Sequence, residues 1–308
     1  MKTIYPAFLF FLTSMIFPQG NNAEPFLPEI FSQFPNVRDI AISPDNDEIY
    51  FSAQSYQGEV SIITRIKKIN NAWSNPEIAS FSGKYFDIEP FLSSDGLKLY
   101  FASNRPMTGT DDKPKDFDIW YVQRENKNSG WSNPVNIGSP INSKDDEFYP
   151  SISENKNFYF TSGGSKSKGK DDIFFSRWEG NTYSTPVSLS DSINSEGYEF
   201  NAFIAPDESY LIFTGYQREG GLGSGDLYIS YKSSDSGWSK AKNLGAEINS
   251  TQMDYCPFVD TKTNTLYFTS RRSSVGNSNI NFSTVQNFLN EMKKYDNGLS
   301  RIYKAILK

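Results

Sequence analysis

Residues 87–138 read DIEPFLSSDGLKLYFASNRPMTGTDDKPKDFDIWYVQRENKNSGWSNPVNIG, and this stretch decides the fold prediction. Four short apolar or aromatic runs can be cut from it, at residues 89–93, 97–103, 118–123 and 131–137. Polar turn residues separate the runs, the first of them Ser94, Asp95 and Gly96. Runs of this length between such breaks indicate β-strands rather than helices. The stretch therefore predicts a four-stranded antiparallel meander.

The second run of this meander recurs along the chain, about every 50 to 60 residues. Its aromatic core is found in five copies, at residues 49–52, 99–103, 158–162, 211–214 and 266–270. The third run recurs as well, with an acidic residue at its start in Asp118, Asp172 and Asp226. Repeats of this length, each a small sheet, are typical of the blades of a β-propeller.

The two ends of the chain complete the last copy of the repeat. Residues 299–306 match a third run, but no fourth run follows them, whereas residues 25–31 match a fourth run that has no copy before it. A closed ring explains both facts if strand 25–31 completes the last blade beside strand 299–306. We therefore predict an all-β, five-bladed propeller of four-stranded antiparallel blades, with a six-bladed ring as the alternative.

One helical pattern interrupts the fifth copy, at about residues 283–296. Val285, Phe288, Leu289 and Met292 fall at the spacing i, i+3, i+4 and i+7, which places them on one face of a helix. This apolar stripe either packs over the end of the propeller or serves as a lid or as a docking helix for a partner.

The first residues of the chain differ from the rest in composition. Lys2 precedes an uncharged apolar run at residues 4–17, and a polar segment follows it. This pattern predicts a secretory signal peptide over residues 1–23, followed by a single propeller domain over residues 24–308. No cysteine lies near the expected cleavage site, so a lipid anchor is not expected. We expect an exported monomer, periplasmic or secreted, without a membrane span.

The composition excludes several classes of function. The chain has 30 basic and 36 acidic side chains, a balance that disfavours nucleic acid or an anionic membrane as a partner. It has no histidine and a single cysteine, Cys256, which disfavours histidine-dependent catalysis and zinc sites. We predict no metal, no cofactor and no catalytic residues, and we interpret Cys256 as a small buried side chain rather than a nucleophile.

An acidic residue recurs at the start of the first strand in four of the five copies. The set consists of Asp87, Glu147, Glu199 and Asp254. The first copy has Val37 at this position, with Asp39 two residues later. These carboxylates either ring one mouth of the central channel and bind a ligand, or accept backbone hydrogen bonds that fix the preceding loop. Because they are near-equivalent copies, the sequence indicates no pair with the unlike environments that acid–base catalysis needs.

Three arginines follow the second strand in only two of the copies, and we name them Arg105, Arg271 and Arg272 as candidate binding residues. Guanidinium groups suit carboxylate recognition, by a ligand or by the acidic set. They lie at the face that carries the long connections between second and third strands, called here the long-loop face. Long loops on a rigid scaffold often bind ligands, so we expect the binding site on this face rather than on the opposite, short-turn face.

The phrase PFLSSDGLKLYFASNR at residues 90–105, followed by Asp118, Ile119 and Trp120, resembles the WD-like β-propeller repeat of the TolB type. Residues 150–162, 206–214 and 257–271 are variants of it. The resemblance implies export to a Gram-negative envelope and function through protein–protein contacts. The extra N-terminal domain of TolB is not expected, since the repeats begin just after the signal peptide. We predict a non-catalytic scaffold for a protein or peptide; the alternative is a carbohydrate-binding or glycosidase-like propeller that uses carboxylates at the channel mouth.

Overall fold

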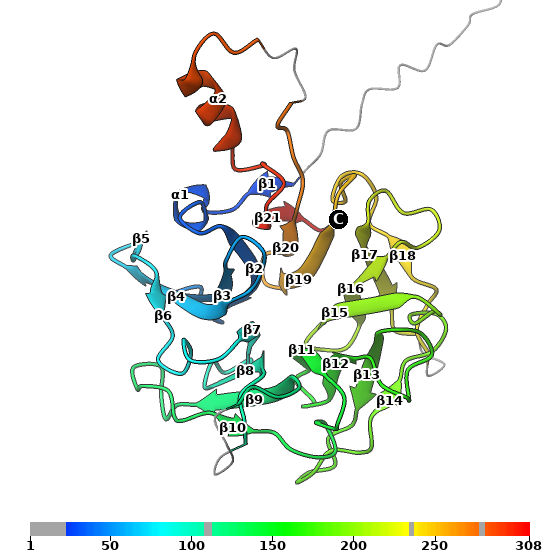
Figure 1. The fold of residues 1–308 in the computed structure, drawn as a ribbon. Coiled ribbons are helices and arrows are strands. Elements are labelled where there is room, and N and C mark those ends of the chain that lie inside the picture. The colour runs from blue at the N-terminus through cyan, green and yellow to red at the C-terminus, as the bar shows by residue number, and fades with distance from the viewer. Residues whose placement is uncertain (1–22, 108–112, 234–236, 277–280) are drawn as a thin grey trace, which may run out of the picture.

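The computed structural model describes residues 23–107, 113–233, 237–276 and 281–308. Nearly all of the predicted signal peptide, residues 1–22, lies outside the described residues. Five small antiparallel sheets are arranged in a ring, with the first strand of each sheet nearest the centre (Figure 1). This arrangement confirms the prediction of an all-β, five-bladed propeller.

The blades follow one another along the chain, and each begins at the strand nearest the ring axis. Blade 1 has β2 (Asn36–Ile42), β3 (Glu48–Gln54), β4 (Ser61–Ile69), β5 (Ala72–Trp73) and β6 (Glu77–Ile78). Blade 2 has β7 (Asp87–Leu92), β8 (Lys98–Ser103), β9 (Asp118–Gln123) and β10 (Val135–Asn136). Blade 3 has β11 (Glu147–Ile152), β12 (Phe158–Ser162), β13 (Asp172–Ser176) and β14 (Val187–Ser188). Blade 4 has β15 (Tyr198–Ile204), β16 (Tyr210–Tyr216), β17 (Gly225–Tyr231) and β18 (Lys242–Asn243). Blade 5 has β19 (Asp254–Asp260), β20 (Thr265–Ser270), β21 (Arg301–Ile306) and β1 (Glu24–Pro25).

The ring closes in blade 5, where β1 pairs with β21 and Glu24 lies opposite Lys304. The closing strand is much shorter than the predicted strand 25–31, which was wrong in its extent. Leu27 has a left-handed backbone conformation, with φ of 42°, and the short helix α1 (Pro28–Phe31) follows it. Pro28 has no N–H to donate to a β-ladder, and the turn lets Phe31 become fully buried.

The core lies between neighbouring blades, where aromatic side chains from two sheets pack together. Between blades 1 and 2, for example, Tyr50 and Ile63 pack with Leu99, Phe101 and Trp120, all of them buried. Fully burying one such side chain contributes about 1.5 to 3 kcal/mol. Each blade therefore depends on its neighbours for its hydrophobic core.

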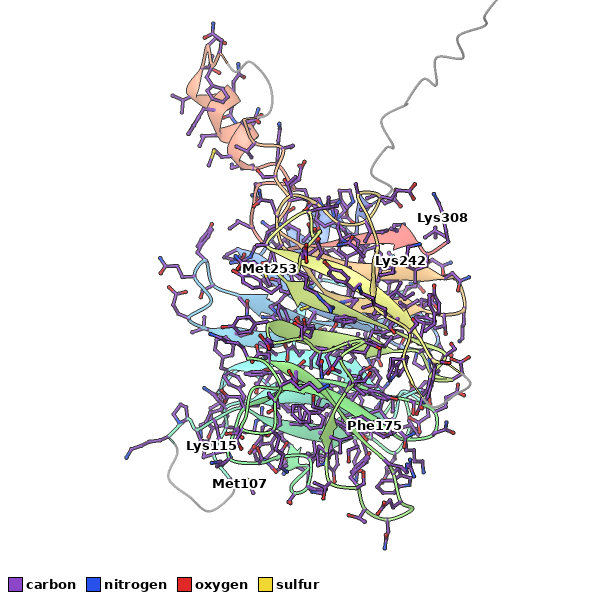
Figure 2. All side chains as sticks on the ribbon, turned by 90° about the vertical axis from the view of Figure 1, so that its right-hand side faces the viewer. Met107, Lys115, Phe175, Lys242, Met253 and Lys308 are labelled. Carbon is purple, nitrogen blue, oxygen red and sulfur yellow. The ribbon has the colours of Figure 1, made fainter. Side chains whose placement is uncertain are left out.

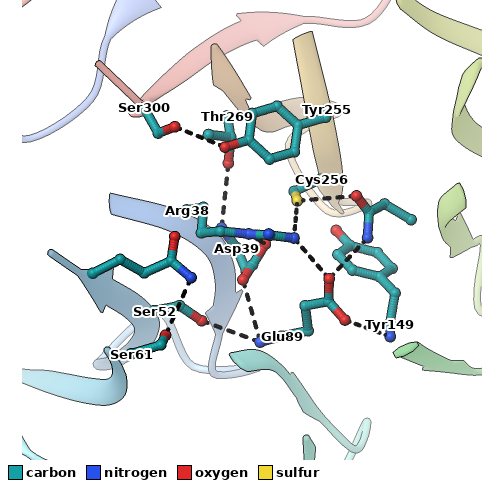
Figure 3. A network of polar contacts seen from close by, with 12 residues as sticks. Arg38, Asp39, Ser52, Ser61, Glu89, Tyr149, Tyr255, Cys256, Thr269 and Ser300 are labelled. Atoms are coloured by element: carbon teal, nitrogen blue, oxygen red, sulfur yellow. Dashed lines mark hydrogen bonds and ion pairs between the residues drawn. The ribbon is translucent and has the colours of Figure 1, made fainter. Parts of the chain in front are cut away.

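Every first strand contains a β-bulge at one residue with positive φ. These residues are Asp39 (φ 53°), Glu89 (60°), Tyr149 (50°), Asn201 (52°) and Cys256 (54°), and the strand register shifts beside each of them. A bulge re-aims the side chain at which it occurs. The side chains of Asp39, Glu89, Asn201 and Cys256 and the backbone N–H of Tyr149 take part in one polar network (Figure 3).

The helix α2 (Val285–Met292) is shorter than the predicted 283–296 and contains no buried residue. Figures 1 and 2 both show it beyond the rim of the ring, on an arm that leaves blade 5 between β20 and β21. Of the two alternatives for the stripe, packing over the propeller's end is therefore contradicted, because no residue of α2 is buried. Among the described residues, neither helix has the length and apolar character needed to cross a bilayer.

Candidate functional site

The four acidic residues of the predicted set are buried in their own blades. Ser143, Ser195 and Ser250 each donate from both the backbone N–H and the hydroxyl to the carboxylate four residues later, which is Glu147, Glu199 and Asp254 respectively. Asp87 accepts from the hydroxyls of Ser82 and Ser103, at 2.7 and 2.6 Å. These contacts fix the loop before each first strand. A contact of these carboxylates with a ligand stays a prediction.

Two of the predicted arginines bind members of this acidic set. Arg105 donates to Asp87 at 2.6 Å and to the carbonyl oxygen of Phe81 at 3.1 Å, and its guanidinium lies 4.8 Å from the ring centroid of Phe101. Arg272 repeats the arrangement in blade 5, where it donates to Asp254 at 3.0 Å. Both arginines are buried. Their binding of an external ligand likewise stays a prediction.

A third arginine takes an equivalent place in blade 4, and the sequence pattern did not reveal it. Arg218 lies 3.6 Å from Glu199, with its guanidinium 5.0 Å from the ring centroid of Tyr228. Arg218 follows Phe213 by five residues, whereas Arg105 and Arg272 follow Phe101 and Phe268 by four, so alignment of the repeats missed it. No such arginine contacts Glu147 among the described residues, and burial raises the pKa of Glu147 to about 7.

The remaining predicted residues lie apart from these pairs. Arg271 is exposed, and its Nε donates to the Ser300 hydroxyl at 3.2 Å. Ser300 in turn contacts the Tyr255 hydroxyl at 2.8 Å, near the ring axis. The stripe residues of α2 lie on the arm that leaves blade 5, and none of them is buried. The structure therefore does not bring the predicted residues together into one site.

The groups that do converge belong to the bulge residues and to Arg38, and Glu89 is at their centre (Figure 3). Its Oε1 accepts from Arg38 at 2.7 Å and from the Asn201 amide at 3.0 Å, and its Oε2 accepts from the Tyr149 backbone N–H at 2.7 Å. These three partners come from blades 1, 4 and 3. One carboxylate of blade 2 thus ties together four blades.

Arg38 extends this network to blade 5. The network is called here the axial cluster and consists of Arg38, Asp39, Glu89, Tyr149, Asn201 and Cys256. Its Nε donates to Asp39 at 2.8 Å, and its guanidinium contacts the Cys256 sulfur at 3.4 Å. The Cys256 thiol donates to Asn201 at 3.3 Å. Burial raises the pKa of Cys256 well above its usual value, so the thiol stays protonated and is a poor nucleophile.

The axial cluster contains two neighbouring carboxylates, a pair that the sequence did not indicate. Burial raises the pKa of Glu89 to about 7; Arg38 opposes this shift, and the charge of Asp39 adds to it. Two neighbouring carboxylates can act as an acid and a base when their environments differ. However, Asp39 and Glu89 are only 1% and 3% exposed, and their oxygens already accept hydrogen bonds from the chain. The geometry suits a cross-blade tie better than catalysis on a substrate.

A cavity of about 220 Å³ opens on the short-turn face, opposite to the face where we expected the binding site. The apolar part of its wall comes from the first strands of all five blades: Ile42, Phe91, Ile152, Phe203 and Phe258. The repeat contained a signal for it, since Phe91, Phe203 and Phe258 each stand two residues after a bulge. Its volume is below that of most small-molecule sites, which occupy about 300 to 1,000 Å³. Within the described part of the chain, no group of three or more acidic or cysteine side chains is arranged to hold a metal.

No protein-family model and no curated protein matches the chain. Solved structures share its fold. TolB from Acinetobacter baumannii matches with a TM-score of 0.50 and 13% identity, over 87% of this chain and 54% of the TolB chain, so this chain spans about half the length of TolB. An alpha-L-arabinofuranosidase from Lactobacillus brevis matches with a TM-score of 0.52 and 13% identity, over 89% of this chain and 93% of the enzyme. A glycoside hydrolase matches with a TM-score of 0.53 and 10% identity, over 94% and 88%. The chain is thus a β-propeller similar in fold to TolB and to glycosidase propellers.

Proposed function

We propose that this protein is an exported, non-catalytic propeller that binds a partner protein through the apolar face of α2. The observation that carries the proposal is the exposure of that face: Val285, Phe288, Leu289 and Met292 are 74%, 46%, 39% and 49% exposed. Contiguous apolar side chains left open to water are typical of interaction sites.

The helix is built to present this face rather than to hide it. Thr284 caps its start, with the hydroxyl accepting from the Asn287 N–H at 3.1 Å. A helix of eight residues is not stable alone in water, so it gains from any surface that covers it. Phe282 packs edge-on against Phe288, with ring centroids 5.3 Å apart, and widens the apolar surface.

The root of the arm is firmly attached to the ring, as a presenting element requires. The Ser274 N–H donates to the Asp296 carbonyl at 2.9 Å, and the Gly298 N–H donates to the Arg272 carbonyl at 3.2 Å. The Tyr295 hydroxyl donates to the carbonyl oxygens of Phe26 and Ile302, at 3.1 and 2.7 Å. These contacts hold the outgoing and returning segments of the arm together where they leave blade 5.

The partner that fits is a protein with an apolar groove, because an amphipathic helix is bound by laying its i, i+3, i+4 and i+7 side chains into such a groove. Phe288 stands at the middle of the stripe and is the expected anchor, since aromatic residues dominate the energetics of interfaces. The buried carboxylates of the axial cluster support a function without catalysis.

The test compares two variants of α2 for recovery of partner proteins from envelope extract. The first is Phe288→Ser with Leu289→Ser, on the apolar face; the matched control is Gln286→Ser with Asn290→Ser, on the polar face. We expect a partner band with the wild type and the control that is lost with the apolar-face variant. All four side chains are exposed, so the melting temperature should not change.

Equal recovery by both variants contradicts the proposal. Sedimentation of the purified protein provides a second arm: if it forms dimers that the apolar-face variant abolishes, the stripe is a self-association surface and no partner protein is needed.

A further inference from the structure

A groove of about 380 Å³ runs between blades 2 and 3 on the short-turn face. The groove adjoins the cavity of about 220 Å³ on the same face, because four residues line both: Ser93, Ser94, Ile152 and Glu154. The volume of the groove is within the range of small-molecule sites. No residue of the α2 arm is part of the lining of this groove.

Aromatic side chains from both blades form the walls of the groove. Tyr100 and Tyr121 come from blade 2, with ring centroids 5.9 Å apart, and Trp178 and Tyr183 come from blade 3, with centroids 4.9 Å apart. Tyr121, Trp178 and Tyr183 are half-buried, so part of each ring stays open to a ligand. Tyrosine and tryptophan offer an apolar ring together with a polar group.

Two lysines, Lys98 and Lys156, line the groove together with two carboxylates, Asp95 and Glu154. The Asp95 carboxylate already accepts hydrogen bonds from the Ser93 hydroxyl and the Leu97 N–H, at 2.6 and 2.9 Å. The Lys98 ammonium lies 4.4 Å from the ring centroid of Tyr121, and the Lys156 ammonium lies 5.9 Å from that of Trp178. Burial lowers the pKa of Lys98 and the charge of Lys156 lowers it further, whereas Asp95 opposes both effects. Neither ammonium forms an ion pair with another described residue. An anion placed between them would relieve their repulsion.

We propose that this groove binds an anionic glycan, with a sugar ring against Trp178 and Tyr183 and a carboxylate between Lys98 and Lys156. The apolar C–H face of a sugar packs on an aromatic ring, and its hydroxyls pair with the polar groups around it. An extended acidic peptide fits less well, since peptides commonly add to an open strand edge and this groove is walled by side chains.

The test is calorimetric titration of the full chain with a trisaccharide of mannuronate, compared with the neutral mannose trisaccharide. We expect binding of the acidic sugar and at least tenfold weaker binding of the neutral one. Lys98→Met with Lys156→Met should weaken binding of the acidic sugar at least tenfold. Trp178→Ala should weaken binding of both sugars.

The matched control is Lys68→Met, because the Lys68 ammonium lies 5.7 Å from the Trp73 ring centroid in blade 1, away from the groove. This variant should bind the acidic sugar like the wild type. Equal affinity for the acidic and neutral sugars overturns the proposal, as does unchanged binding by the double lysine variant. Binding of a tripeptide of aspartate without binding of the mannuronate trisaccharide overturns it in favour of a peptide site. Melting curves identify any variant that fails to fold, and Lys98→Met alone then replaces the double variant.

Discussion

At the scale of single residues, Glu89 carries the most unusual environment in the molecule. It accepts hydrogen bonds from three blades while Asp39 already neutralises Arg38. Burial raises the pKa of Glu89, Arg38 opposes this shift, and the charge of Asp39 adds to it.

This shift predicts how stability depends on pH. Because the pKa of Glu89 is raised from 4.5 to about 7, the folded state binds this proton more tightly than the unfolded state does. Glu89 therefore contributes stability that is fully present below about pH 4.5 and is lost as the pH rises through about 7. The Glu89→Gln variant has no ionisable group at this position. Between pH 5 and 8 its free energy of unfolding should therefore fall by about 1 to 3 kcal/mol less than that of the wild type. Urea unfolding at each pH measures the difference.

Glu147→Gln is the matched comparison, because the pKa of Glu147 is also raised to about 7 but this residue lies outside the axial cluster. Each substitution should remove part of the fall in stability, and the double variant should remove more than either. A pH dependence of Glu89→Gln identical to that of the wild type would show that Glu89 does not titrate in this range.

At the scale of elements, the arginine–carboxylate pairs join loops to strands. Arg105→Ala should leave the buried Asp87 carboxylate without its cationic partner, which should lower the free energy of unfolding by about 3 to 5 kcal/mol. Arg65→Ala is the control: Arg65 pairs with Glu77 at 2.9 Å on the surface, and its loss should cost less than about 1 kcal/mol. Urea unfolding at pH 7 compares the two, and equal losses would contradict a structural role for the buried pair.

The elements also show what sequence reasoning could and could not reach. The aromatic second strands and their turns were enough to predict the blades. The predicted strand 25–31 failed because one left-handed residue, Leu27, and the proline after it turn the chain into α1. Arg218 was missed because it follows the aromatic Phe213 of its repeat by five residues, whereas Arg105 follows Phe101 by four.

The axial cluster was out of reach for a different reason. Its members differ in type from blade to blade, so no repeat marks them, and their direction depends on a bulge with positive φ. Asp39 was noticed as an irregularity in the repeat, but its neighbour Glu89 was not. The interblade groove was missed because its walls, such as Tyr121 and Trp178, come from different repeats and meet only in space.

At the scale of the whole molecule, the closure of the ring should make unfolding cooperative. Phe26, next to β1, packs against Tyr267 with ring centroids 4.8 Å apart. Phe26→Ala should lower the free energy of unfolding by about 1 to 3 kcal/mol, since the side chain is half-buried. Circular dichroism and tryptophan fluorescence should still report a single coincident transition at a lower temperature.

Phe282→Ala on the arm is the control for this prediction, because it removes the same side chain from an exposed position. Its melting temperature should equal that of the wild type. If the two signals of Phe26→Ala separate on melting, blade 5 opens independently and closure does not govern the stability of the ring.

One side chain connects the arm with the closure of the ring. The Tyr295 hydroxyl bonds to Phe26 beside the closing strand and to Ile302 in β21. The joint lies within blade 5, where β1 and β21 are held together by hydrogen bonds and packing alone, whereas the chain runs continuously from each blade to the next. A pulling force on α2 would therefore be transmitted first to the mechanically weakest joint of the propeller, and a partner that clamps the arm in place would reinforce that joint.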